Sequence, residues 1–529
     1  MKYIADAREA KEIDGISIQK IGIPSFVLME RASLKVAECV RRIMEGKKGR
    51  ILVACGSGNN GGDGAAAGRI LKEWGYEVVI ALLGNEEKAS KEMKLQLQIA
   101  RNLSIPVITE PVIAEYTVII DAIFGIGLSR DISGDYAGWI AEINNTDAVI
   151  VSVDIPSGID ASTGKILGVA VHADYTVTFG VNKRGLVLFP GTQYAGKVLV
   201  EDIGFPEKAV HEVSPAVISY ERSDIKRLFP KRLPRSNKGN YGKTLVIAGS
   251  KQISGAAYFT AAGAYQMGSG LVKVFTHENN RIMLQTKLPE ALLYTYQGNE
   301  RLPADYMDDI FERGREAVPF LEQDSEKGES EEFVKCLKNE LCWASAVVIG
   351  PGLGTSRMAE LLLYEVLKIT DIPVLMDADA LNLLPRFPEY FNEDGRIQLT
   401  DNFVLTPHLK EMSRLLGSDV ESIKDNLIDT ACRYTKGAVV VLKDARTVVS
   451  DGTRIYLNQS GNNALAKGGS GDVLSGMIGG LLARGMEPFR AAALGVYLHG
   501  LTAEEYVKEG SFSTMLATDI LERLPALVP

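Results

Sequence analysis

The segment 464–476, ALAKGGSGDVLSG, places several glycines and one carboxylate, Asp472, directly before an apolar run. Glycine lets backbone N–H groups approach an anion closely, and a helix that begins after such a loop adds the positive end of its dipole. Bound phosphate repels a carboxylate, so a carboxylate at this position needs a chemical role. We expect Asp472 to be a base that takes a hydroxyl proton while the N–H groups hold a transferring phosphoryl group. The alternative is a tight turn in which Asp472 only caps a helix over 473–483.

Polar groups also follow three predicted strands in the first half of the chain. They lie in GSGNNGGDG (56–64), in DAIFGIG (121–127) and in VDIPSGID (153–160). In open α/β sheets ligands bind outside the carboxyl ends of the strands, so we expect these three segments to converge on one site. Their oxygen-bearing side chains suit a hard monovalent cation better than zinc, because the segments contain no cysteine or histidine. The first segment also satisfies G-x-G-x-x-G, a weak signal that a structural turn alone would give.

Three segments of the second half carry polar groups at predicted strand ends. They are IGPGLG (349–354), MDADALNLL (376–384) and TPHLKE (406–411). His408 is either a site residue or an isolated core or cap histidine. Glu411 is either a site residue or a favourable first-turn charge of a helix, worth about 0.3–1 kcal/mol.

Short runs rich in valine and isoleucine alternate with helical patterns, which predicts open α/β sheets with helices on both faces. The strands predicted for the first half are 50–55, 77–83, 116–124, 147–154 and 175–180, with helices at 26–45 and 63–74 between them. The alternation lapses over 204–223 and resumes with strands at 244–250, 345–354, 373–381, 402–407 and 438–444. The predicted fold class is therefore α/β, with two domains joined near residue 215.

Composition narrows the class of protein further. The 529 residues exceed one ordinary core, and fractions of 46% apolar and 24% charged residues are typical of a globular protein. A formal net charge of −9 leaves no basic surplus for nucleic acid or an anionic membrane. Five cysteines without a CxxC pair, no signal peptide and no apolar run of about 18 residues indicate a cytoplasmic protein. The acidic segment 322–332 is expected to be a solvated loop or helix face.

The order and spacing of the three first-half motifs resemble the NAD(P)HX epimerase family, also called YjeF N-terminal domains, over residues 1–212. The resemblance implies a Rossmann-like doubly wound sheet and a substrate, hydrated NADH or NADPH, that is inverted at its C6 hydroxyl. It implies a potassium ion on Asn60, Asp121 and Ser157, and a proton-moving catalytic carboxylate at Asp154. The substrate-binding residues implied are Asn60, Gly61, Gly62, Asp63, Gly64, Gly125, Ile126, Gly127, Leu128, Ser129, Arg130, Asp131 and Asp154.

The KGGSGD loop and the motifs before it resemble the ribokinase-like superfamily, and within it the ADP/ATP-dependent NAD(P)HX dehydratases, over residues 220–529. The resemblance implies a ribokinase-like α/β domain in which Asp472 is catalytic. The substrate-binding residues implied are Leu353, His408, Lys410, Glu411 and Asp472. The nucleotide-binding residues implied are Lys443, Asp444, Ala445, Arg446, Thr447, Asn462, Asn463, Ala464, Lys467, Gly468, Gly469, Ser470 and Gly471.

Together the two resemblances imply a bifunctional repair enzyme. One domain epimerises the R and S forms of hydrated NADH or NADPH, and the other dehydrates the S form at the expense of ADP or ATP, with magnesium. We expect these small molecules as partners, no nucleic acid, no membrane, and a homo-oligomer. The alternative is a vitamin kinase of the same superfamily fused to a non-catalytic nucleotide-binding module. The second half contains no P-loop motif, G-x-x-x-x-G-K-[ST], and this absence excludes a P-loop kinase.

Overall fold

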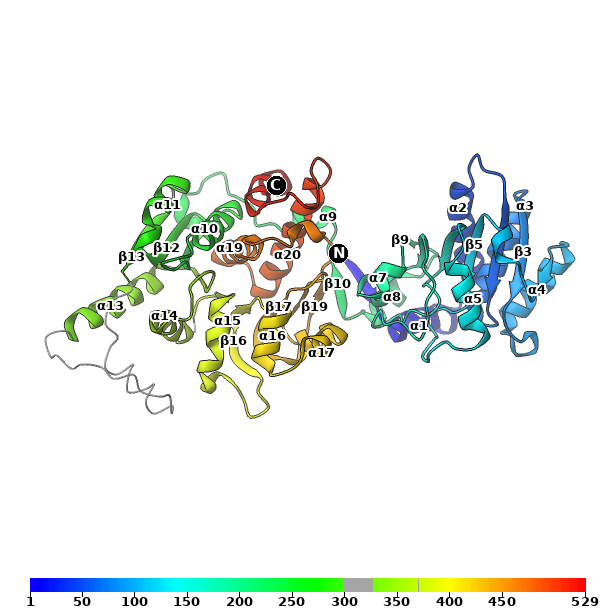
Figure 1. Cartoon of the computed structure of the whole chain (residues 1–529), viewed down its shortest axis with the longest axis horizontal. Coiled ribbons are helices and arrows are strands. Elements are labelled where there is room, and N and C mark those ends of the chain that lie inside the picture. Colours follow the sequence, from blue (N-terminus) through cyan, green and yellow to red (C-terminus); the bar gives the residue numbers. More distant parts are fainter. Residues whose placement is uncertain (298–326, 370) are drawn as a thin grey trace. The chain divides into compact units, whose positions relative to one another are not determined.

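The computed structural model describes residues 1–297, 327–369 and 371–529 (Figure 1). Contacts within the chain divide it into two compact units, Lys2–Ile218 and Ser219–Pro529, with Met1 belonging to the second. We call them the N-terminal unit and the C-terminal unit. Of the acidic segment 322–332, residues 322–326 lie outside the described residues. Residues 327–332 form the start of helix α13 (Lys327–Trp343).

The N-terminal unit contains a seven-stranded parallel sheet in the order β4-β3-β2-β5-β6-β7-β9. Its strands are β2 (Arg50–Cys55), β3 (Glu77–Leu82), β4 (Val107–Ile108), β5 (Val118–Ala122), β6 (Val149–Val153), β7 (Tyr175–Phe179) and β9 (Lys197–Glu201). The order runs outward in both directions from β2 and β5, which is the predicted doubly wound Rossmann arrangement. The switch point lies between β2 and β5, so the loops after these two strands border the crevice where such folds bind ligands.

Helices cover both faces of this sheet. Side chains of α2 (Ser25–Ile43), α3 (Asn59–Glu73) and α4 (Lys91–Asn102) form one core with it, and those of α5 (Asp135–Asn144) belong to a second core. The remaining helices of the unit are α1 (Ala7–Gly15), α6 (Arg184–Val187), α7 (Gly191–Tyr194) and α8 (Glu207–Val213). Strand β1 (Lys2–Ala5) pairs in parallel with β8 (Asn182–Lys183), which brings α1 beside the β8 segment.

The C-terminal unit has a mixed sheet in the strand order β13-β12-β11-β14-β15-β16-β17-β18-β19. Its strands are β11 (Lys243–Ile247), β12 (Leu271–His277), β13 (Leu292–Tyr296), β14 (Ala346–Ile349), β15 (Val374–Met376), β16 (Ile397–Leu405), β17 (Thr435–Leu442), β18 (Val448–Ser450) and β19 (Ile455–Leu457). Pairing is parallel as far as β17, and β18 and β19 add antiparallel. The predicted α/β class is therefore confirmed for both halves of the chain.

Helices α10 (Gly255–Gln266) and α19 (Ser470–Ala483) pack closely against each other in the C-terminal unit. A Cβ atom at Gly476 of α19 would lie 2.0 Å from the carbonyl oxygen of Thr260 in α10, so glycine is what permits this approach. The other main helices are α9 (Arg222–Leu228), α11 (Arg281–Lys287), α14 (Arg357–Leu367), α15 (Asp379–Leu383), α16 (Leu409–Leu416), α17 (Val420–Asp425), α18 (Leu427–Arg433), α20 (Pro488–Tyr506) and α21 (Ala517–Leu527).

The segment 204–223, in which the sequence shows no sustained period, contains regular elements after all. Helix α8 and the short strand β10 (Val217–Ser219) lie within it, and α9 begins at its end. These elements are too short to establish a periodicity, which explains why the pattern missed them.

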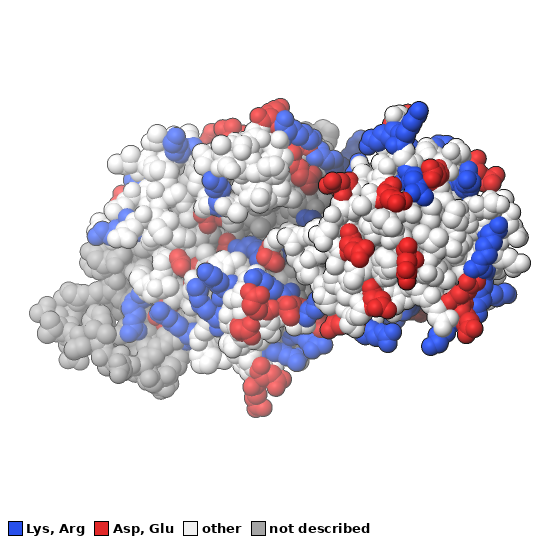
Figure 2. Space-filling view, turned by 45° about the vertical axis from the view of Figure 1, so that its right-hand side comes forward, with Lys and Arg blue, Asp and Glu red and all other residues white. Residues whose placement is uncertain are grey.

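Two further properties bear on possible partners. No helix formed by residues 1–297, 327–369 and 371–529 is both long enough and apolar enough to cross a membrane. Figure 2 shows acidic and basic side chains interspersed over the face of the N-terminal unit that is in view. A continuous basic surface of the kind that nucleic acid requires is therefore not seen on that face.

Candidate functional site

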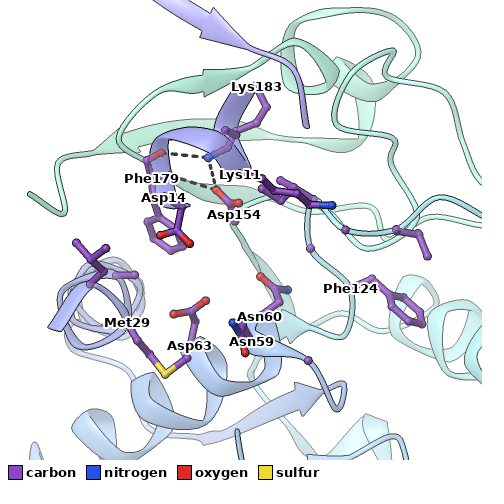
Figure 3. Close-up of a pocket in the computed structure, with 18 of the residues that line it drawn as sticks. Lys11, Asp14, Met29, Asn59, Asn60, Asp63, Phe124, Asp154, Phe179 and Lys183 are labelled. Atoms are coloured by element: carbon purple, nitrogen blue, oxygen red, sulfur yellow. Dashed lines mark hydrogen bonds and ion pairs between the residues drawn. The ribbon is translucent and has the colours of Figure 1, made fainter. Parts of the chain in front are cut away.

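A cavity of about 810 Å³ opens at the switch point of the N-terminal unit. It is bordered by α1, the start of α3, the loop after β5, and the ends of β6 and β8 (Figure 3). Of the residues predicted to bind substrate, those that line it are Asn60, Asp63, Gly125, Ile126, Gly127, Leu128, Ser129, Arg130 and Asp154. The other four, Gly61, Gly62, Gly64 and Asp131, are not among its lining residues. Gly61, Gly62 and Gly64 are buried in α3. They pack against Gly56, Met29 and Ala122, respectively.

The loops after β2 and β5 touch directly at this site. A Cβ atom at Gly56 would lie 2.0 Å from the carbonyl oxygen of Ile123, so no other residue fits there without a backbone shift. The glycine-rich segment therefore serves close packing at the switch point as well as access to the cavity.

Asp154 forms a buried ion pair at the cavity wall. It follows β6 with a φ of +64°, a conformation that non-glycine residues rarely adopt and that is concentrated at functional sites. Its Oδ1 atom accepts hydrogen bonds from Lys183 Nζ, from Thr178 Oγ1 at 2.9 Å and from the Phe179 N–H at 3.3 Å. Lys183 is 2% exposed and also donates to Thr178 Oγ1 at 2.8 Å, so the network fixes both members of the pair.

Two more carboxylates, Asp14 of α1 and Asp63 of α3, face the same space. Figure 3 shows the Asp14 and Asp63 carboxylates directed toward each other, with Asp154 nearby at the cavity wall and turned toward Lys183. Burial raises the pKa of Asp63 well above its ordinary value, and the charges of Asp154 and Asp14 add to this effect. Burial and the charge of Asp154 also raise the pKa of Asp14, whereas Lys183 opposes that rise.

Asp121 and Ser157 meet beneath the cavity, next to Asn60. The Asp121 carboxylate is fully buried and accepts hydrogen bonds from Ser157 Oγ at 2.5 Å, the Ser157 N–H at 2.9 Å and Ser152 Oγ at 2.7 Å. Burial raises its pKa against the effect of these donors. Asn60 approaches from α3, where its Oδ1 atom would lie 3.1 Å from a Cβ at Gly125, and its buried Nδ2 has no partner among the described residues.

The side chains of Asn60, Asp121 and Ser157 are of types that suit a hard cation of low charge. A buried carboxylate that no lysine or arginine pairs within the described residues gains from a positive charge beside it. In the part of the chain that the structure describes, no cluster of three or more His, Cys, Asp or Glu side chains is arranged to hold a metal ion. The available donors are one carboxylate, one hydroxyl and one amide oxygen, which suit an alkali cation better than zinc.

In the C-terminal unit, Asp472 lies in the first turn of α19 rather than before it. The helix begins at Ser470, after Gly469 with a φ of +88°, and no side chain caps it. The alternative that Asp472 caps a helix over 473–483 is therefore wrong. The glycines did not stop the helix from starting early, because packing against α10 outweighs their low helix propensity. Burial raises the pKa of Asp472 to about 6, with a further rise from Asp377, opposition from Lys443 and a small rise from Asp379.

A buried ion pair lies beside Asp472. Asp377, at the carboxyl end of β15, accepts hydrogen bonds from Lys443 Nζ at 2.7 Å and from Ser475 Oγ of α19 at 2.6 Å. Burial raises the pKa of Asp377, but Lys443 and Ser475 outweigh it, so the net direction is downward. A Cβ atom at Gly471 would lie 3.7 Å from Lys443 Nζ, which shows that the loop after β17 meets the start of α19.

The other predicted substrate residues of the C-terminal unit occupy neighbouring strand ends. His408 caps α16, because its Nδ1 atom accepts hydrogen bonds from the N–H groups of Lys410 and Glu411, both at 3.1 Å. Glu411 completes a capping box by accepting the His408 N–H at 2.8 Å. Burial lowers the pKa of His408 and raises that of Glu411. Leu353 is 3% exposed, so its side chain is buried in the loop after β14, and the Gly354 N–H donates to Asp379 at 2.8 Å.

The predicted nucleotide residues form two groups. Lys443, Asp444, Ala445, Arg446 and Thr447 make up the connection between β17 and β18. Asn462, Asn463, Ala464, Lys467, Gly468, Gly469, Ser470 and Gly471 lie in a short 3₁₀ turn and the chain that enters α19. Ser470 is buried, and its hydroxyl lies 3.1 Å from Nε2 of His499, whose pKa burial lowers to about 4. The two groups meet beside Asp472, because Gly471 of the second group approaches Lys443 of the first, and Lys443 lowers the pKa of Asp472.

Sequence reasoning missed three residues of these sites. Asp14 and Lys183 lie outside the glycine-rich and aspartate-containing segments that marked the rest, and Ser475 lies inside the segment 464–476 but was given no role. Asp14 sits in an ordinary amphipathic helix, and Lys183 in VNKRG follows no recognised pattern. One signal was present for Ser475, since it is one helical turn beyond Asp472.

Two α/β units, each with buried carboxylates at the carboxyl ends of its strands, define a two-domain α/β enzyme. A family model described as NAD(P)H-hydrate dehydratase matches residues 244–526, and one described as YjeF-related protein N-terminus matches residues 25–185. The bifunctional NAD(P)H-hydrate repair enzyme Nnr of Moorella thermoacetica is 33% identical over 99% of this chain and 96% of its own length. That of Coxiella burnetii is 33% identical over the whole of both chains.

The chain therefore belongs to the family of bifunctional NAD(P)H-hydrate repair enzymes. Its activity is the repair predicted from the sequence, epimerisation and dehydration of hydrated NADH and NADPH. The alternative of a vitamin kinase fused to a binding module is wrong, because both halves match the two models of this one family. Among solved structures, the ADP/ATP-dependent NAD(P)H-hydrate dehydratase of Bacillus subtilis, co-crystallised with ATP and Mg²⁺, is 29% identical over 58% of this chain and 96% of its own, with a TM-score of 0.44.

Proposed function

We propose that the two activities are divided between residues 1–212, which epimerise, and residues 220–529, which dehydrate. The observation that carries this division is that each unit holds its own carboxylate at its site. Asp154 borders the cavity of the N-terminal unit, and Asp472 lies beside the Asp377–Lys443 pair of the C-terminal unit. Each unit therefore has a group able to move a proton.

In the epimerase site, Asp154 accepts or returns the proton that C–O cleavage and re-addition at C6 require. The ion pair with Lys183 fixes its position, and the +64° backbone turn brings it from the strand end to the cavity wall. Asn60, Asp63, the 125–131 loop and Asp154 hold the hydrated nicotinamide in this cavity. The buried glycines of α3 support this wall from behind.

Potassium is the cation that we propose for Asn60, Asp121 and Ser157. Two observations support it: the buried Asp121 carboxylate bonds to Ser157, and Asn60 lies against the loop after β5 at Gly125. When bound, the ion would neutralise Asp121 and hold together the ends of β5 and β6. Asp121 and Ser157 would then fix the two loops that border the cavity.

In the dehydratase site, Asp472 takes the proton of the C6 hydroxyl as the hydroxyl oxygen attacks the terminal phosphoryl group of ADP or ATP, whose bond to the bridging oxygen breaks to release AMP or ADP. Phosphate then leaves C6, and loss of a ring proton restores the dihydropyridine. The N–H groups of the loop before α19 hold the phosphoryl oxygens, and residues 443–447 contact the nucleotide. We propose magnesium as the nucleotide's counterion, and His408, Lys410, Glu411 and Leu353 as contacts to the nicotinamide substrate.

The test is incubation of the full chain with a mixture of the R and S forms of hydrated NADH, with and without nucleotide. We expect exchange of the two forms without nucleotide, and full recovery of reduced-nicotinamide absorbance with ADP or ATP. Recovery of the S fraction alone would contradict the epimerase assignment. Accumulation of a phosphorylated product without release of phosphate would contradict the dehydratase assignment. Self-association into a homo-oligomer stays a prediction, to be checked by light scattering.

A further inference from the structure

We infer that Asp63 is the acid that protonates the leaving hydroxyl during epimerisation, with Asp154 as the base, and that Asp14 keeps Asp63 in its acid form. The inference rests on the proposed epimerase site and assigns a second catalytic group within it. Figure 3 shows the arrangement that suggests it, with Asp63 rising from α3 toward Asp14, and Asp154 on the far side of Asp14.

The hydrogen bonds divide the carboxylates of this site into two kinds. Asp121 and Asp154 each accept several hydrogen bonds. Within the described residues the Asp63 carboxylate accepts none, and only its backbone oxygen is bonded, to Ser33 Oγ at 2.9 Å. A partly buried carboxylate without donors, facing two like charges, retains its proton.

The other charges around the cavity do not reverse this conclusion. Its titratable lining residues, besides Asp63, are Lys11 and Asp14 of α1, Glu92 of α4, Arg130 and Tyr136 after β5, Asp154 after β6 and Lys183 of β8. Lys183 is paired with Asp154, and Glu92 accepts a hydrogen bond from Ser25 Oγ at 3.0 Å. The positive end of α3 would favour a charged Asp63, but Asp63 is the fifth residue of the helix and this effect fades beyond the first turn. Burial and the two aspartates accordingly raise the pKa of Asp63.

The chemistry needs two carboxyl groups in opposite protonation states. The Asp63 proton passes to the oxygen on C6, the C6–O bond breaks, water leaves, and the N1 lone pair forms the C6=N1 double bond. A water molecule then adds to the opposite face of C6, and its proton passes to Asp154. One water leaves and one enters, one proton is given and one is taken, and exchange with solvent restores both carboxyl groups. Paired groups whose surroundings push their pKa values apart divide acid and base roles in this way.

The experiment uses the full chain and the exchange of R and S hydrated NADH without nucleotide. For Asp63→Asn we expect kcat to fall by about 10²–10⁴-fold with KM changed only a few-fold, the usual effect of losing a positioned acid. For Asp14→Asn we expect most of the maximal rate to remain, with the alkaline limb of kcat/KM moved to lower pH. Removal of a neighbouring negative charge lowers the pKa of Asp63, so the acid form is lost sooner as pH rises. Asp147→Asn is the matched control, because this exposed residue precedes β6 and so lies at the amino ends of the strands, opposite the cavity.

An Asp63→Asn rate within about five-fold of the parent, or an alkaline limb that Asp14→Asn does not move, would overturn the inference. If Asp63→Asn fails to fold, as judged by thermal unfolding, the Asp14→Asn pH profile decides alone. Asp154→Asn separates this inference from the proposed function. If it abolishes exchange while Asp63→Asn does not, only the role of Asp63 is wrong. If neither variant affects exchange, the epimerase site itself is misplaced.

Discussion

The Lys443 ammonium group lies 2.7 Å from Oδ1 of Asp377, and Asp377 is 2% exposed. This pair sets the charge around Asp472, because Asp377 raises the pKa of Asp472 and Lys443 lowers it. Ser475, from the same helix as Asp472, donates to the second oxygen of Asp377 at 2.6 Å. The helix that carries the proposed base is thus bound to the strand end that carries the ion pair.

Replacement of Asp472 by asparagine should abolish most of the dehydration. Asparagine keeps the shape of the side chain but cannot accept the hydroxyl proton, so the rate should fall by about 10²–10⁴-fold while nucleotide still binds. Epimerisation in the same preparation is the internal control and should be unchanged. Dehydration within a few-fold of the parent would remove Asp472 from the mechanism.

The pH dependence of dehydration should follow the protonation of Asp472. Its pKa of about 6 means that the base is ionised above that pH, so kcat/KM should fall about tenfold for each pH unit below it. Lys443→Met removes a charge that lowers this pKa, and the inflection should move to higher pH at saturating nucleotide. Lys424→Met, at an exposed surface pair with Glu421, should leave the inflection in place. An inflection that stays fixed in Lys443→Met would contradict the proposed coupling.

Loss of Asp377 should destabilise the C-terminal unit. Asp377→Asn leaves Lys443, whose side chain is only 20% exposed, without its carboxylate partner. Breaking a buried pair in this way costs about 2–4 kcal/mol of the free energy of unfolding. Chemical denaturation measures the change in the free energy of unfolding. Glu421→Gln, which breaks an exposed pair with Lys424 at 2.8 Å, should show no such change. Equal losses in the two variants would show that burial of the pair does not matter.

The two units should act when separated. Residues 1–212 should equilibrate the epimers without nucleotide, and residues 220–529 should dehydrate the S form with it, because the recorded contacts at each site stay within one unit. Epimer exchange and absorbance recovery measure the two activities in separate tubes. If neither fragment folds, the proposed boundary is wrong.

The oxygen cluster at Asp121 should bind an alkali cation. Crystals soaked with rubidium in place of potassium should show anomalous scattering between Asn60, Asp121 and Ser157. Ser157→Ala removes one ligand and should weaken the signal, whereas Ser162→Ala, outside the cluster, should not. Density for water alone in crystals grown with potassium would count decisively against the site.

The strands that the sequence predicted are confirmed, because buried parallel strands are continuous apolar runs, but the parallel strands β4, β9, β12 and β13 were missed. The prediction of 50–55 matches β2 residue for residue, and the segments that follow β2, β5 and β6 do converge. The starts of α3 and α19 were predicted too late, since glycine suggests loops and only the packed neighbours show otherwise. Asp14 and Lys183 acquire their roles from distant segments, through the pairing of β1 with β8, and no local pattern encodes that pairing.

The positive φ angles at two strand ends have opposite consequences for thermal adaptation. Asp154, at +64°, and Ala378, at +50°, both hold a conformation that costs a non-glycine residue about 1–3 kcal/mol. At Ala378 the methyl group performs no chemistry, so a change to glycine would relieve the strain and leave every functional group in place. At Asp154 the same change would gain stability by deleting the carboxylate. A selection for heat resistance alone would therefore stabilise the active protein at Ala378 but inactivate it at Asp154. A screen that also measures epimer exchange would distinguish the two variants.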